Sequence, residues 1–205
     1  MARDPEKGAR RTELRARRRD LAAARDVAAD GRQLADHVLR LLDDLALGAG
    51  SVVTSYVARP GEPPTAPLNA ALAAHGIRVL VPITLPDLDL DWRDAVDDDV
   101  GDDAASPPLG PDAVALADVV LAPGLAVDHS GTRMGQGGGC YDRALPRRRP
   151  GTAVVVVLHP GELLAPNEPA LPRQAHDQPV DAVVTAEGVV DLGLSPWSST
   201  PPGAG

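Results

Sequence analysis

The sequence predicts an α/β fold: a single three-layer α/β/α domain built on a central, mostly parallel sheet. Three observations lead to this prediction. Short apolar segments lack the alternation of half-exposed strands, which indicates a sheet covered on both faces. Helical patterns separate many of these segments, as in α/β proteins. A chain of 205 residues, 43% of them hydrophobic, is long enough for one such core.

The predicted strands are apolar runs that end in turn signals. SVVTSYV (51–57) leads into a Gly-Pro loop, and ADVVLAPGL (117–125) contains the strand stop Pro123-Gly124. The full set of predicted strands is 51–57, 77–83, 117–125, 152–159 and 181–187.

Helical spacing of apolar residues predicts the remaining elements. Residues 9–47 are predicted to be helical, with a break between two helices at Asp30-Gly31. Another helix is expected around 66–75, and a further one is expected to begin near Gly139-Cys140. The clearest stripe in the first region consists of Leu34, Val38, Leu41 and Leu45.

Two segments are expected to lie outside the regular structure of the domain, which spans 1–194. The acidic segment 87–103 carries nine aspartates and predicts a solvated, mobile loop. Its alternating aspartates also allow a calcium loop, but Trp92 occupies the turn position that requires Gly, and no Glu closes the loop. The Pro/Gly/Ser-rich tail 195–205 is predicted to be disordered.

Charge and cysteine content narrow the function classes. The net charge of −9 argues against general nucleic-acid binding. A single cysteine cannot form an internal disulfide, which indicates the cytoplasm. Neither a signal peptide nor an apolar run of membrane-spanning length is found, so no membrane partner is expected.

The segment GTRMGQGGGCYDR (131–143) follows a predicted strand and precedes a predicted helix. Glycines let backbone N–H groups approach a ligand closely, so this loop predicts an anion site, above all for phosphate. Arg133 is expected to add a charged contact to the same oxygens, and Asp142 is placed to hold Mg²⁺ carried by a phosphate. The loop matches neither the P-loop nor the dinucleotide-binding signature.

This glycine loop resembles the G-x-R-x-G-x-G-x-G-Y-Y-D-[RK] loop of the 5-formyltetrahydrofolate cyclo-ligase family. The similarity continues in LAPGLAVDHSG (121–131), in HDQPVDAVVT (176–185) and in SYVARPGEPPT (55–65), so it covers nearly the whole chain in order. It implies ATP-dependent cyclisation of 5-formyltetrahydrofolate to 5,10-methenyltetrahydrofolate, with ATP as co-substrate and Mg²⁺ as cofactor. The formyl oxygen would be phosphorylated before ring closure, with release of ADP and phosphate.

The resemblance also implies roles for individual residues. Arg133 and Tyr141 would be catalytic, and Asp142 and Asp177 would hold Mg²⁺. The residues expected to bind ATP are Lys7, Arg11, Arg133, Met134, Gly135, Gln136, Gly137, Gly138, Gly139, Cys140 and Tyr141. Those expected to bind the folate are Val57, Glu62, Gln136, Gly137, Gly138, Gly139 and Cys140.

Two alternatives concern the amino-terminal cations and the activity. The register with Lys7 and Arg11 places Arg18, Arg19 and Leu21 at family distances, whereas a competing register uses Arg11 and Arg15. Cys140 stands where the family has its first Tyr, so a folate- or nucleotide-binding relative without catalysis is the alternative function. An NAD(P) enzyme is disfavoured because the glycines follow a middle strand rather than the first. A monomer is expected, with a dimer left open.

Overall fold

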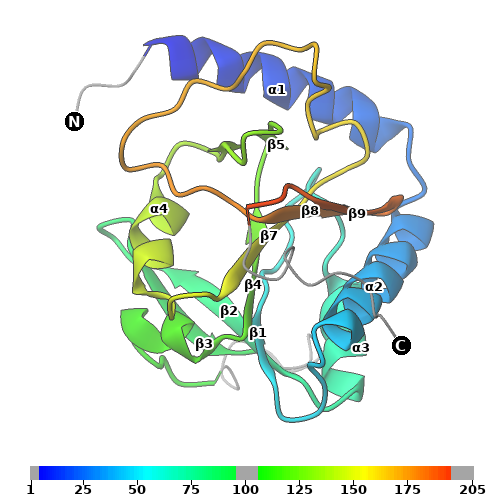
Figure 1. Ribbon diagram of the computed structural model, residues 1–205, viewed down its shortest axis with the longest axis vertical. Helices are drawn as coiled ribbons and strands as arrows, with labels where there is room; N and C mark the ends of the chain where they lie inside the picture. Colours follow the sequence, from blue (N-terminus) through cyan, green and yellow to red (C-terminus); the bar gives the residue numbers. More distant parts are fainter. Residues whose placement is uncertain (1–4, 96–105, 195–205) are drawn as a thin grey trace.

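The computed structural model describes residues 5–95 and 106–194 and has a seven-stranded sheet at its centre (Figure 1). The strand order is β3-β2-β1-β4-β7-β8-β9. The five central strands are parallel, and the edge strands β3 and β9 are antiparallel to their neighbours. Their bounds are β1 Val52–Thr54, β2 Arg78–Thr84, β3 Leu90–Asp94, β4 Val119–Pro123, β7 Ala153–Val157, β8 Ala182–Thr185 and β9 Gly188–Asp191. The predicted α/β class and mostly parallel sheet are confirmed.

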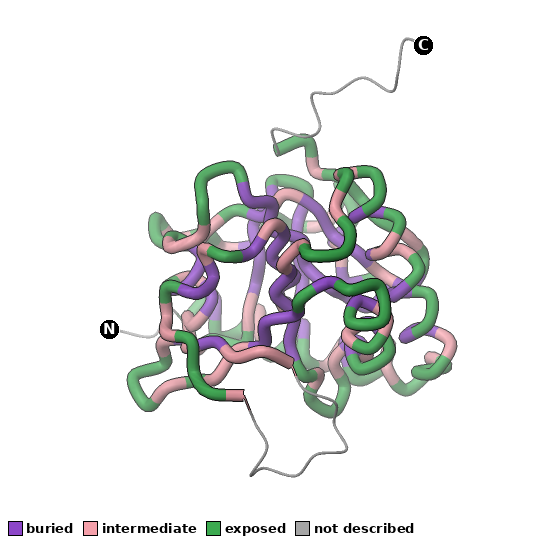
Figure 2. Tube along the Cα trace, turned by 90° about the horizontal axis from the view of Figure 1, so that it is seen from below, coloured by how far each residue is buried: buried purple, intermediate pink, exposed green. Residues whose placement is uncertain are grey.

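Helices cover both faces of the sheet, as predicted. On one face, α2 (Val27–Asp44) and α3 (Ala66–Ala74) pack against alternate residues of the strands. On the other face lie α4 (Cys140–Ala144) and the short 3-10 helices Pro111–Leu116 and Leu145–Arg147. The strands between these layers are largely buried, which explains why they read as continuous apolar runs (Figure 2).

Helix α1 (Pro5–Ala23) lies outside these two layers, across one end of the sheet (Figure 1). Its Leu14 packs into a small separate core with Leu125, Met134 and Leu164. Two of these residues flank or belong to a two-stranded sheet formed by β5 (Ala126–Val127) and β6 (Arg133–Met134). The helix therefore covers the segment that follows the carboxyl end of β4.

The predicted break at Asp30-Gly31 is wrong, because both residues lie inside α2. The helices are instead separated at Asp26, whose carboxylate caps α2 by accepting hydrogen bonds from Ala28 N (3.1 Å) and Ala29 N (3.0 Å). Gly31 serves packing: a Cβ there would lie 2.7 Å from Pro67 Cγ, so the glycine lets α3 approach α2.

The acidic segment is only partly as predicted, because residues 90–94 form strand β3. Leu90 and Trp92 alternate with Asp91 and Arg93. Both apolar side chains are buried in the core between the sheet and α4. This two-residue period is a strand signal that the density of aspartates obscured. Residues 96–103 of the segment, and the tail 195–205, lie outside the described residues. Strand β9 and the β5–β6 pair were not predicted either.

Candidate active site

The glycine loop lies beyond the carboxyl end of β4, a central strand of the sheet. After β4, the chain forms the β5–β6 hairpin, whose turn is held by Asp128: its Oδ1 accepts hydrogen bonds from Ser130 N (3.0 Å) and Thr132 N (3.1 Å). Residues 135–139 then lead directly into α4. The strand, loop and helix start that the sequence predicted are therefore all present, at the carboxyl end of a middle strand.

Bare backbone N–H groups are available in this loop. None of the N–H groups of residues 136–139 donates a hydrogen bond to a described residue, and these residues are exposed or half-buried. Gly137 and Gly139 have positive φ angles, 106° and 70°, which residues other than glycine rarely adopt. Because α4 has only five residues, its dipole adds little, and an anion bound here would be held by these N–H groups and nearby cations.

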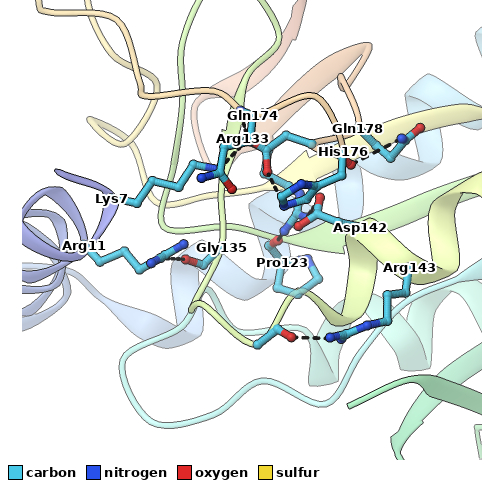
Figure 3. A network of polar contacts seen from close by, with 12 residues as sticks. Lys7, Arg11, Pro123, Arg133, Gly135, Asp142, Arg143, Gln174, His176 and Gln178 are labelled. Carbon is cyan, nitrogen blue, oxygen red and sulfur yellow. Dashed lines mark hydrogen bonds and ion pairs between the residues drawn. The ribbon is translucent and has the colours of Figure 1, made fainter. Parts of the chain in front are cut away.

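Helix α1 presents a stripe of cations to this region (Figure 3). Lys7 Nζ pairs with Asp177, and Arg11 Nε donates to Gly135 O (3.2 Å). Arg15 donates to the carbonyl of Gln136 (2.8 Å). The helical period brings positions of both proposed registers to one face, so both contact the site.

Arg133 is the central cation of the loop itself. Its guanidinium bonds Asp142 Oδ1 (2.9 Å) and Pro123 O (3.2 Å), and it lies 5.7 Å from the centre of the Tyr141 ring. Burial raises the pKa of Tyr141 well above its ordinary value, against the opposing charge of Arg133, so the phenol stays protonated. Arg133 Nε and Tyr141 Oη are both buried, and neither has a hydrogen-bond partner among the described residues, which marks polar groups able to meet a ligand.

The predicted metal ligands Asp142 and Asp177 are each paired with a cation. Asp177 binds Lys7, and its pKa is lowered: burial raises it, but the hydrogen bonds from Lys7 and from Gln174 N outweigh that effect. Among residues 5–95 and 106–194, no group of three metal-ligating side chains is found. Mg²⁺ bound through phosphates needs only one or two protein carboxylates, so the prediction for Asp142 and Asp177 does not require such a group.

The residues expected on the folate side lie in the segment after β1. Val57 is 61% exposed, and Glu62 is half-buried, with Oε2 accepting from Arg59 N (3.0 Å). Beside them lies Tyr56, a residue not predicted for the site, whose buried hydroxyl has no hydrogen-bond partner in the described part of the chain. Burial, followed by the charge of Glu62, raises its pKa well above the ordinary value.

The largest omission of the sequence-based site is a buried ion pair beneath the loop. Arg18 binds both carboxylate oxygens of Glu162, at 2.6 and 2.7 Å, and also the carbonyl of Gly124. The partners are separated by 144 positions, so no local pattern could have found them. Cys140, the departure from the family motif, is half-buried and unpaired at the start of α4.

Comparison with known proteins identifies the class of protein that this fold and loop define. The model of the 5-formyltetrahydrofolate cyclo-ligase family matches residues 3–186. A 5-formyltetrahydrofolate cyclo-ligase of Mycolicibacterium smegmatis is 35% identical over 156 residues, which cover 70% of this chain and 78% of the relative. The chain belongs to the 5-formyltetrahydrofolate cyclo-ligase family.

Solved structures support the fold. A 5,10-methenyltetrahydrofolate synthetase from Mycoplasma pneumoniae superposes with a TM-score of 0.68 at 15% identity, covering 88% of this chain and 99% of that one. The corresponding synthetase from Aquifex aeolicus gives a TM-score of 0.61 at 24% identity, covering 89% and 92%. At these identities the likeness extends to the fold alone. In residues 5–95 and 106–194, no helix combines the length and the apolar character that a membrane span requires.

Proposed function

We propose that the protein is an ATP- and Mg²⁺-dependent 5-formyltetrahydrofolate cyclo-ligase. It would convert 5-formyltetrahydrofolate and ATP to 5,10-methenyltetrahydrofolate, ADP and phosphate. The observation that supports this most is the contact of Arg11 and Arg15 with a glycine loop that carries Arg133. In this loop, the N–H groups of residues 136–139 donate to no described residue. Such an arrangement suits the triphosphate of a nucleotide, whose oxygens accept from both kinds of donor. We further propose a cytoplasmic monomer without nucleic-acid or membrane partners.

The chemistry requires the formyl oxygen to leave, and an amide oxygen is a poor leaving group. Transfer of the γ-phosphoryl group to that oxygen converts it into phosphate ester. Nitrogen N10 of the folate then attacks the formyl carbon, the C–O bond breaks, and phosphate departs with the oxygen. Catalysis of phosphoryl transfer is mostly positioning and charge neutralisation, which Arg133 and the loop N–H groups can supply.

The remaining predicted residues have consistent roles in this proposal. Asp142 and Asp177 would hold Mg²⁺, which neutralises phosphate charge when bound. Tyr141, protonated because of its burial, would donate a hydrogen bond near the transferred group. Val57 and Glu62 would contact the folate from the segment after β1, opposite the loop residues 136–140.

The test is the growth of the absorbance band of methenyltetrahydrofolate when purified protein receives MgATP and 5-formyltetrahydrofolate. The band should grow only with ATP present, and Arg133→Ala should abolish its growth. Arg32→Ala, which removes an exposed arginine of α2, is the matched control and should retain the activity. A flat trace from folded protein that binds the folate in calorimetry would instead identify the non-catalytic relative that Cys140 suggests.

A further inference from the structure

A buried polar chain connects helix α1 to the opposite side of the site. Arg18 and Glu162 have side chains 6% and 1% exposed, and together they form a two-point ion pair. Glu162 Oε2 also accepts from His159 N (2.8 Å), while Glu162 N donates to His159 O (3.1 Å). The turn 159–162 is thus closed on itself and fixed to α1.

The network of hydrogen bonds continues from this turn to the segment that carries Glu62. His159 is 3% exposed, and its Nε2 lies 3.1 Å from Gly61 O. A carbonyl oxygen can only accept, so Nε2 must carry the proton and donate. Among the described residues, this is the only hydrogen bond that joins residues 59–62 to another part of the chain.

The segment 59–62 has little else to hold it. Its other hydrogen bonds are internal, between Arg59 and Glu62, and residues 59–61 are exposed. Gly61 has φ of 84°, so the backbone turns sharply where His159 holds it. Glu62 follows immediately, and its position therefore depends on the His159 contact.

We propose that His159 is a positioning residue for the folate, acting through residues 59–62 and anchored by Glu162 to Arg18 of α1. This inference rests on the proposed function for the assignment of Glu62 to the folate side. His159 itself touches neither substrate in this account. Helix α1 would then organise both sides of the site: the nucleotide side through Lys7 and Arg11, and the folate side through this buried network of hydrogen bonds.

The experiment compares His159→Leu with His159→Gln, whose side-chain amide can restore a donor near the position of Nε2. Dissociation constants for 5-formyltetrahydrofolate and for ATP are measured separately by calorimetry, together with the melting temperature. His75→Leu is the matched control, because it makes the same substitution at an exposed histidine, at the carboxyl end of α3.

We expect His159→Leu to weaken folate binding roughly tenfold, as expected for the loss of one buried hydrogen bond that holds the site. ATP binding should change less than about twofold, and His159→Gln should recover most of the folate affinity. An unchanged folate constant in His159→Leu would overturn the proposal. Equal losses for both ligands with a lower melting temperature, not recovered by Gln, would also overturn it by showing a merely structural role.

The two proposals fail in different ways. Wild-type protein that binds the folate but produces no methenyl band would refute the proposed activity. The dissociation constants of the His159 variants for the folate would still decide the role of His159. Wild-type protein that does not bind 5-formyltetrahydrofolate would refute both.

Discussion

Replacing Glu162 with leucine should destabilise the protein far more than an ordinary loss of a salt bridge. The carboxylate is 1% exposed and accepts three hydrogen bonds: 2.6 and 2.7 Å from Arg18, and 2.8 Å from His159 N. Leucine would leave a buried guanidinium whose one remaining partner in residues 5–95 and 106–194 is the Gly124 carbonyl. Breaking a buried pair in this way costs about 3–5 kcal/mol.

This cost is large relative to the stability of a domain, about 5–15 kcal/mol. For a chain of this size, it corresponds to a fall in melting temperature of roughly 6–20 °C. Urea unfolding followed by circular dichroism measures the free energy, with extrapolation to water.

The matched control is Glu168→Gln, which disrupts another ion pair of the same helix. Arg17 and Glu168 also approach to 2.6 Å, but their side chains are 36% and 28% exposed, so solvent screens the interaction. Its loss should cost less than about 1 kcal/mol. Equal effects of Glu162→Leu and Glu168→Gln would refute the reasoning that burial decides the magnitude.

Three further predictions concern the site. The lowered pKa of Asp177 means that its pair with Lys7 stabilises the protein above the unfolded pKa of about 3.9, so the deficit of Lys7→Met in urea unfolding should shrink as pH falls below that value. A deficit independent of pH between 3 and 7 would contradict this. Cys140→Tyr should raise kcat/KM for the folate by roughly two- to tenfold through aromatic contact, and a decrease would show that the thiol is the better residue here. Gly137→Ala and Gly151→Ala, at φ of 106° and 85°, should each lower the free energy of unfolding by about 1 kcal/mol or more. Only Gly137→Ala should raise KM for ATP, because Gly151 lies outside the glycine loop. Equal KM values for the two variants would argue against binding of the nucleotide by the loop.

The main elements of the fold were predictable because their signals are local. All five predicted strands are present, since a sheet covered on both faces leaves continuous apolar runs in the sequence. The helix break was misplaced because Asp30-Gly31 looks like a turn, whereas its role depends on Pro67 of another helix. Strand β3 was missed because the composition of its segment masked the alternation of Leu90 and Trp92.

In the candidate site, too, only features that are local in the sequence could be predicted. The glycine loop is continuous in sequence, so its residues could be predicted from their spacing. Its approach to Arg11, 124 positions away, was implied only by the family resemblance. The contacts of His159 could not, because the histidine meets Gly61 across 98 positions and no motif marks either residue. Tyr56 was likewise read only as part of a strand, and its unpartnered buried hydroxyl is a property of the folded chain.

Arginines from both registers proposed for α1 contact the glycine loop. Arg11 binds the carbonyl of Gly135 and Arg15 binds the carbonyl of Gln136. In a trans peptide the C=O of one residue and the N–H of the next point in opposite directions, and the described residues contain no cis peptide bond. The arginines therefore turn the N–H groups of Gln136 and Gly137 away from the helix, toward the open side of the loop. Besides adding positive charge, they orient the donors on which the proposed anion binding depends.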